Sequence, residues 1–202
     1  MLSNTHRRWN IIALLFFIAF MNYVDRQSLS VVAPHMQSEL HLNDQEYGHI
    51  VSLFLFASAI AYGISGYIAD LIGARRSMAL FVTWWSVAEA ATTFTRSALT
   101  LAIARFCLGL GEPGLWVAAP KAVSEIFPQR DRGLAIGVYT AGATVGAVAA
   151  LPLILFLTTT LPWRAIFFID GVIGLLIVPV WLSVFRNSSH VAPACSHSAA
   201  SI

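Results

Sequence analysis

Six long apolar stretches, joined by short polar loops, constrain the fold of this chain more than any other feature. The hydrocarbon core of a bilayer is about 30 Å thick and needs about 20 mostly apolar residues of helix. The apolar residues run continuously instead of alternating, and lipid offers no partners to the backbone, so the stretches predict helices and not the strands of a barrel. The sequence therefore predicts an all-α integral membrane protein, a bundle of six transmembrane helices over residues 1–187. The predicted spans cover about residues 9–33, 47–68, 77–95, 98–120, 133–157 and 164–185.

The overall composition agrees with a membrane protein. Hydrophobic residues make up 57% of the chain and charged residues 11%, whereas a soluble domain usually carries about a quarter charged residues. The net charge is only +2, and the few basic residues are spread along the chain, so we expect no nucleic-acid partner. The predicted partner of most of the surface is the lipid bilayer.

The orientation of the bundle follows from the basic residues in its loops, because Lys and Arg gather on the cytoplasmic side. A cytoplasmic N-terminus leaves only Arg96 and Arg164 outside. The polar segment 188–202, rich in Ser, Ala and His, is predicted to be a disordered cytoplasmic tail. Both termini are thus predicted to be cytoplasmic. The inner basic residues are then Arg7, Arg8, Arg75, Arg76, Lys121, Arg130, Arg132 and Arg186.

Four charged residues lie well inside the apolar runs: Asp25, Arg26, Arg105 and Glu112. An ionisable group at such a position costs about 2.5–3.5 kcal/mol on insertion scales, and it normally faces a cavity or a partner. Buried ion pairs that only fix helix packing are the alternative. With four charges on two helices we favour a transport pathway, and we rank Glu89 and Asp170 as weaker candidates that either satisfy packing or face the membrane interface.

Helix geometry places these groups relative to one another. Asp25 and Arg105 each lie about 10 Å below the outer edge of the core, so they could form a pair. Glu112 follows Arg105 by two turns on the same helical face.

Neighbours on the first span divide between two faces. Asn22 and Tyr23 share a face with Arg26 through i,i+4 and i,i+3 spacing. Asp25 points about 100° away. One helix could thus present Arg26 to a substrate and Asp25 to a neighbouring helix.

The chemistry of these side chains points to transport of an organic anion. The planar guanidinium fork of Arg26 or Arg105 suits a carboxylate. A carboxyl group in an apolar cavity favours its neutral form, so Asp25 or Glu112 could load and release protons. Neither a nucleophile–base pair nor a metal-ligand spacing appears in the sequence, so we expect no enzyme activity, cofactor or metal.

The loop between the second and third predicted spans carries a spaced pattern of glycine, acidic and basic residues. It resembles the signature loop of the major facilitator superfamily, in which a Gly, an Asp, a second Gly and basic residues follow at fixed spacing. Leu71 departs from the pattern, since the family usually has Arg or Lys there. The resemblance implies that the loop latches helices on the cytoplasmic side during alternating access. The matching residues are Gly66, Asp70, Gly73, Arg75 and Arg76.

Further segments resemble the anion:cation symporter family, which includes transporters of hexuronates, glucarate and galactonate. They are residues 22–26, 105–113 and 163–164, and the resemblance extends over roughly residues 7–187. It implies that Arg26 binds the substrate carboxylate, that Asp25 and Glu112 couple protons, and that Arg105 tunes them.

Other candidate binding residues are Asn22, Tyr23, which the resemblance places in the lining of the site, and Tyr62. Tyr62 lies one turn after Ser58, the position where some sugar-acid transporters carry a tyrosine. This departure, together with Gly142 at a position that is polar in some members, leaves the substrate open.

Members of this family have twelve spans and bind substrate between two six-helix halves. The resemblance therefore implies that the chain is the N-terminal half of a transporter in the inner (plasma) membrane of a bacterial cell. Three possibilities stay open: a truncated fragment that does not transport, a module that joins a second six-helix half, and a homodimer.

Overall fold

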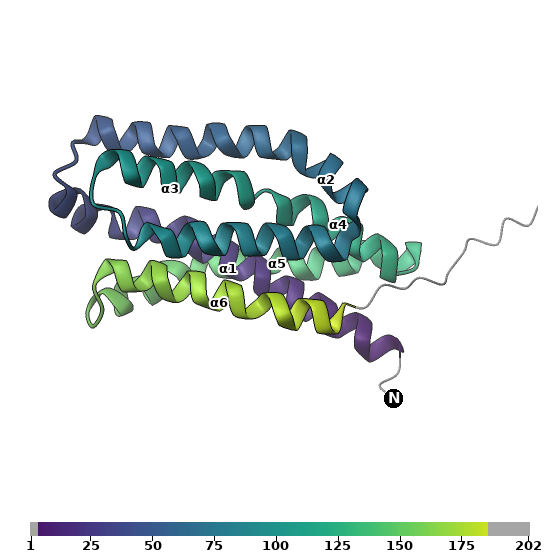
Figure 1. Ribbon diagram of the computed structural model, residues 1–202. Helices are drawn as coiled ribbons and strands as arrows, with labels where there is room; N and C mark the ends of the chain where they lie inside the picture. Colours follow the sequence, from purple (N-terminus) through teal and green to yellow (C-terminus); the bar gives the residue numbers. More distant parts are fainter. Residues whose placement is uncertain (1–3, 186–202) are drawn as a thin grey trace, which may run out of the picture.

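The computed structural model describes residues 4–185, and every regular element in this part of the chain is a helix (Figure 1). The predicted tail at 188–202 lies outside the described residues. The helices run along one common direction, with the first described turn of α1 and the end of α6 at the same end of the bundle (Figure 1). They are α1 (Asn4–Leu40), α2 (Asp44–Thr92), α3 (Ala98–Gly111), α4 (Gly114–Ile126), α5 (Gln129–Thr158) and α6 (Trp163–Val184).

Five stretches of the described chain are long and apolar enough to cross a membrane, with α3 and α4 counted together as one. The second stretch is α2, whose 49 residues would extend about 74 Å at 1.5 Å per residue, more than twice the thickness of the hydrocarbon core. The helix is interrupted at Gly73, and the chain turns back there (Figure 1). The two arms of α2, residues 44–72 and 74–92, leave room for two of the six predicted spans. The division into six spans stays a prediction.

The turn within α2 depends on a glycine. Gly73 has a φ of 79° and a ψ of 162°, a conformation that is strongly unfavourable for a residue with a Cβ atom. The predicted gating loop lies around this turn. Nearby, Lys121 Nζ of α4 donates to Asp70 Oδ1 at 2.6 Å, and Trp181 Nε1 of α6 donates to the backbone oxygen of Arg75 at 2.9 Å. The loop therefore ties α2 to both α4 and α6.

At the other end of the bundle, away from the first described turn of α1, hydrogen bonds join α1 to α6. Trp163 Nε1 donates to Glu39 Oε2 at 2.6 Å, and Arg164 forms an ion pair with the same carboxylate. Arg164 also donates to the backbone oxygen of Thr95 at 2.9 Å. The Trp-Arg pair that precedes the sixth predicted span thus joins the ends of three elements.

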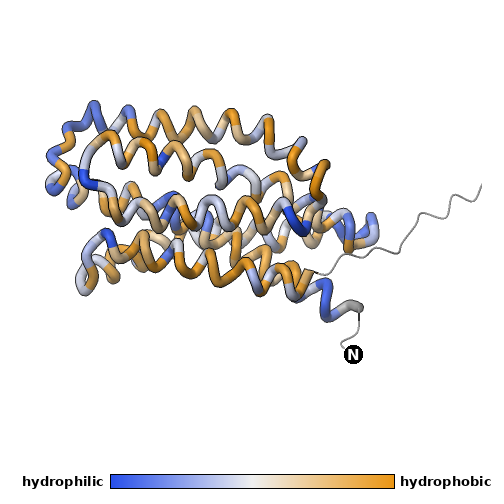
Figure 2. Tube along the Cα trace, in the orientation of Figure 1, coloured by the Kyte–Doolittle hydropathy of each residue, from blue (hydrophilic) through white to orange (hydrophobic). Residues whose placement is uncertain are grey.

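Hydrophobic residues fill the middle of the bundle and hydrophilic ones gather at its two ends (Figure 2). α1 packs against α5 and α6, and α2 packs against α3, α4 and α6. Many large apolar side chains nevertheless remain exposed, including Phe56, Val148 and Leu176. Contiguous apolar surface of this kind fits contact with lipid or with a partner.

Small residues allow α1 and α5 to approach closely. A Cβ atom added at Gly142 or Gly146 would collide with the backbone carbonyl oxygen of Phe16 or Phe20 on α1. In lipid, helices associate through such close packing, because apolar side chains gain little by leaving lipid. These two glycines therefore serve the close packing of α5 against α1.

We therefore expect Gly146→Leu to destabilise the bundle, because overpacking costs about 1–3 kcal/mol or more when the backbone must move. Thermal unfolding of the purified chain in detergent should show a lower Tm. Gly137→Leu on the same helix is the matched control, since nothing lies within 4 Å of its added Cβ. Equal Tm values for both variants and the wild type would contradict this account of the α1–α5 contact.

Candidate functional site

A break between α3 and α4 positions Glu112, one of the fully buried acids of the bundle. Pro113 has no backbone N–H and cannot continue the hydrogen bonding of α3. Glu112 forms the C-cap of α3, with its N–H bonded to the oxygen of Leu108 at 3.1 Å. Its side chain is completely buried, so it requires a partner inside the bundle.

That partner is Arg26 of α1. Arg26 Nη2 lies 2.7 Å from Glu112 Oε2, and Arg26 Nε donates to the same oxygen at 3.2 Å. The arginine side chain is 33% exposed. One guanidinium therefore holds the buried carboxylate and keeps part of its surface open.

Aromatic rings surround this guanidinium. Its Cζ lies 5.6 Å from the ring centres of both Tyr23 and Phe54, where cation–π attraction contributes. Tyr23 in turn packs edge-on against Trp116, with 6.0 Å between the ring centres. Tyr62 on the first arm of α2 is 48% exposed. Sequence reasoning missed Phe54, because a lone Phe in an apolar run carries no signal of a site.

The estimated depths of Asp25 and Arg105 suggested that the two could form a pair. In the structure, Arg105 of α3 pairs with another acid. Its Nη1 lies 3.5 Å from Glu89 Oε2 of α2, and its Cζ lies 4.8 Å from the ring centre of Phe167 on α6. The depth of a residue along its helix does not say which neighbouring helix that residue faces. Here the second arm of α2 provides Glu89 as the partner of Arg105. Arg105 is buried, with 2% of its side chain exposed.

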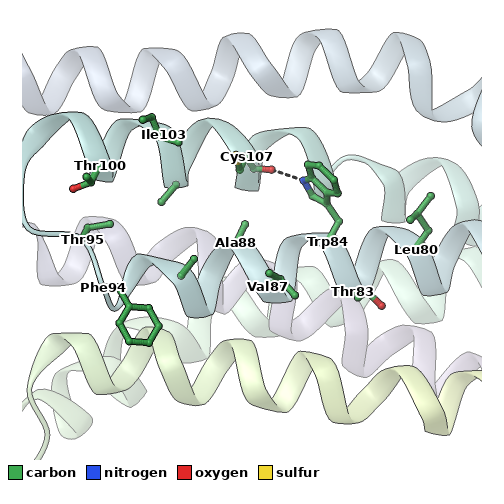
Figure 3. A pocket seen from close by; sticks show the side chains of 12 residues that line it. Leu80, Thr83, Trp84, Val87, Ala88, Phe94, Thr95, Thr100, Ile103 and Cys107 are labelled. Carbon is green, nitrogen blue, oxygen red and sulfur yellow. Dashed lines mark hydrogen bonds between the residues drawn. The ribbon is translucent and has the colours of Figure 1, made fainter.

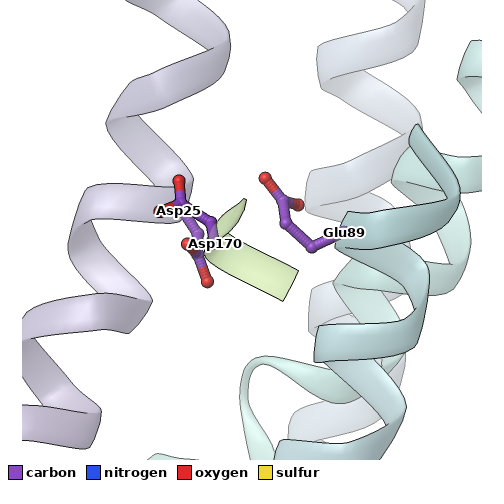
Figure 4. Close-up of side chains that lie close together, drawn as sticks. All are labelled: Asp25, Glu89 and Asp170. Carbon is purple, nitrogen blue, oxygen red and sulfur yellow. The ribbon is translucent and has the colours of Figure 1, made fainter. Parts of the chain in front are cut away.

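Asp25 instead meets two other acids. Asp25, Glu89 and Asp170 approach one another from α1, α2 and α6 (Figure 4). Oxygen atoms of the three side chains all lie within 4.8 Å of one another, and all three residues are buried. Ser28 Oγ donates to Asp170 Oδ2 at 3.5 Å. We call these three residues the three-carboxyl cluster. Glu89 and Asp170, the weaker candidates from sequence, thus belong to the charged centre of the bundle.

Asn22 is placed differently from Arg26. It is completely buried on α1, and neither atom of its side-chain amide has a hydrogen-bond partner among the described residues. Of the predicted binding residues, the structure brings Tyr23 and Arg26 together, leaves Tyr62 half-exposed and buries Asn22 and Arg105. The predicted proton-coupling acid Glu112 pairs with Arg26.

A cavity of about 580 Å³ opens between the second arm of α2 and α3, away from Arg26 and Glu112. Its lining is mostly apolar, and Trp84 Nε1 bonds the backbone oxygen of Cys107 at 2.8 Å (Figure 3). Phe94 at its rim is 73% exposed. Without a charged side chain in its lining, this cavity suits hydrocarbon chains and not an anion.

The geometry gives two charged groups inside one apolar bundle. The Arg26–Glu112 pair is balanced, and its guanidinium is partly exposed. The three-carboxyl cluster and Arg105 are buried, and the most exposed of these residues is Asp170 at 8%.

Similar proteins give the context of this arrangement. The chain is 30% identical over 180 residues to a hexuronate transporter of Escherichia coli K12, covering 89% of this chain and 42% of that protein. It is 29% identical to a galacturonate transporter of Dickeya chrysanthemi, of which it covers 52%. A D-galactonate transporter of Escherichia coli O6:H1 is 28% identical. The chain thus spans about half the length of the curated relatives that it matches.

Solved structures share the fold. A bacterial homologue of the human lysosomal transporter Spinster, in an inward-facing conformation, superposes with a TM-score of 0.79 at 24% identity, over 90% of this chain and 43% of that one. The proton:xylose symporter XylE superposes with a TM-score of 0.81 at 15% identity, over 92% of this chain and 46% of that one. The bundle is therefore half of a major-facilitator fold.

The sequence itself matches the Major Facilitator Superfamily over residues 15–200. This match covers far more than half of the chain, and members of the superfamily are transporters and not enzymes. The protein is a multi-pass membrane protein that belongs to the Major Facilitator Superfamily.

Proposed function

We propose that the chain forms one half of a proton-coupled symporter of an organic anion, with sugar acids such as hexuronates, glucarate and galactonate as the substrate class. The observation that carries this proposal is the partly exposed guanidinium of Arg26, held by a fully buried carboxylate and flanked by Tyr23 and Phe54. The relatives that transport hexuronate, galacturonate and galactonate support the substrate class.

An incoming carboxylate would replace Glu112 on Arg26. The guanidinium can make a bidentate contact with a carboxylate, while the aromatic rings beside it offer apolar contact to the body of a sugar acid. Tyr62, which is half-exposed on the first arm of α2, would complete the lining. Asn22 and Arg105 would support the site from the interior.

Proton coupling would follow from the same competition. When the substrate carboxylate occupies Arg26, the displaced Glu112 is left without its cation in a buried place. An unpaired carboxylate there is strongly unfavourable, so Glu112 would take a proton as the anion binds. Asp25 would be the second proton-coupling acid. Binding of the anion and the proton would thereby favour each other.

The gating loop would control access from the cytoplasmic side. The Lys121–Asp70 contact is largely exposed, with 80% of the Asp70 side chain accessible, so it is weak enough to break during a conformational change. Gly66, Gly73, Arg75 and Arg76 would complete this latch, and both termini would lie in the cytoplasm of a bacterial cell, bounded by its inner membrane.

We expect Arg26→Ala to abolish binding of galacturonate to the purified chain, because the variant lacks the cation that would pair with the substrate carboxylate. Ligand-induced stabilisation in a thermal-shift assay measures this. Arg26→Lys should weaken binding about tenfold or more, since an ammonium group cannot form the bidentate contact with a carboxylate. Arg130→Ala is the control, because Arg130 lies at the start of α5 with 86% of its side chain exposed. Unchanged binding in Arg26→Ala would remove Arg26 from the site.

The alternative function is a chain that does not transport alone, either as a fragment or as a module that needs a partner. The exposed apolar faces of α2 and α5 and the partial exposure of Arg26 favour a partner. This partner would be a second six-helix half or a second copy of the chain.

Disulfide cross-linking in membranes tests the second copy, starting from a chain whose Cys107 and Cys195 are replaced by Ala. A homodimer that covers the face around Arg26 should cross-link through Tyr62→Cys. Leu176→Cys, 63% exposed on α6, is the control and should stay monomeric. A monomer in both variants would contradict the homodimer and leave transport to assembly with a different half.

A further inference from the structure

Charges inside the bundle do not balance. Arg26 neutralises Glu112 at 2.7 Å, whereas Arg105 is the only basic side chain within 4 Å of a member of the three-carboxyl cluster among the described residues. Three ionised carboxylates beside one guanidinium would leave two uncompensated negative charges. Burying even one unpaired charge is strongly unfavourable, so the cluster must carry further positive charge.

Unpartnered polar atoms around the cluster show that hydrogen-bond donors are missing. Asp25 Oδ1 and both carboxylate oxygens of Glu89 have no hydrogen-bond partner among the described residues, although all are buried. The amide of Asn22, one turn before Asp25 on the same side of α1, is also buried without a partner. Buried acceptors in native proteins almost always have a donor, and a protonated carboxyl group next to them would provide one.

Three other charged residues lie inside the described bundle: Arg26 on α1, Arg105 on α3 and Glu112 at the C-cap of α3. Arg26 already pairs with Glu112. The charged residues of α5 are confined to its first turn, and Lys121 and Glu125 lie in the last two turns of α4. Neither helix brings a second basic residue to the cluster.

We propose that Asp25, Glu89 and Asp170 form a buried proton store that holds two protons at neutral pH, with Glu89 and Asp170 as proton sites in addition to Asp25 and Glu112. Its use in transport rests on the proposed function, whereas its protonation does not. Two neutral carboxyl groups and one carboxylate paired with Arg105 balance the charge, and the O–H groups provide the missing donors.

A metal ion fits the cluster less well. Hard cations such as Ca²⁺ need six to eight oxygen ligands, while Ser28 is the only hydroxyl that the described residues add, through its bond to Asp170. Arg105 already lies 3.5 Å from Glu89, and its charge would repel a cation placed among these oxygens.

Infrared spectroscopy of the purified full chain tests the store directly, because protonated carboxyl groups absorb apart from carboxylates. The folded wild type at neutral pH should show a carboxylic C=O band in a preparation exchanged into D₂O. Glu89→Gln should lower the band by about half, because two carboxyl groups beside Arg105 leave one surplus negative charge. Asp170→Asn should do the same, and the double variant should abolish the band.

Asp131→Asn is the control, since Asp131 is a half-exposed acid at the start of α5 that pairs with the exposed Arg130, and it should leave the band unchanged. Absence of the band in the folded wild type overturns the proposal, whatever the variants do. Loss of the wild-type band on addition of saturating NaCl or CaCl₂ also overturns it, because a metal ion would then occupy the cluster. A normal band together with failed galacturonate binding would refute the transport proposal and not the proton store.

Discussion

A charge inside a hydrocarbon core must be neutralised by its immediate neighbours, and this requirement organises the centre of the bundle. Lipid provides no counterions, and an unpaired ion there costs several kcal/mol. Six of the chain's charged residues meet this condition together. Arg26 and Glu112 neutralise each other, Arg105 lies against Glu89, and Asp25 and Asp170 depend on a proton or on that same arginine. The packing of α1, α2, α3 and α6 brings these groups within reach of one another.

The two charged groups differ in access, and this difference suggests a division of labour. Arg26 is 33% exposed and stands among aromatic rings, as a binding residue for an anion should. The three residues of the cluster are buried instead, and the most exposed of them is Asp170 at 8%. Under the proposed function, an anion that takes Arg26 from Glu112 would change the charge balance of the interior. Binding at the accessible group would thereby be linked to proton occupancy in the buried cluster.

Sequence patterns predicted the helical membrane fold and identified Asp25, Arg26, Arg105 and Glu112 as charges inside it, whereas the loop that contains Gly73 followed from the family resemblance. The fold and the buried charges depend on local rules: continuous hydropathy and the high cost of a charge in an apolar span. Partner choice could not be predicted, because it depends on which faces of distant helices meet. The suggested Asp25–Arg105 pair is absent for that reason. Glu89 meets Arg105 because the second arm of α2 packs beside α3, and the sequence does not show this contact.

The most direct test of the coupled site is the pH change that accompanies anion binding to the purified chain in a weakly buffered solution near neutral pH. If the anion displaces Glu112 from Arg26, galacturonate should cause proton uptake and raise the pH, whereas the neutral sugar galactose should not. Glu112→Gln should bind galacturonate with much less proton uptake. Galacturonate binding without proton uptake in the wild type would contradict the proposed competition between the substrate carboxylate and Glu112 for Arg26.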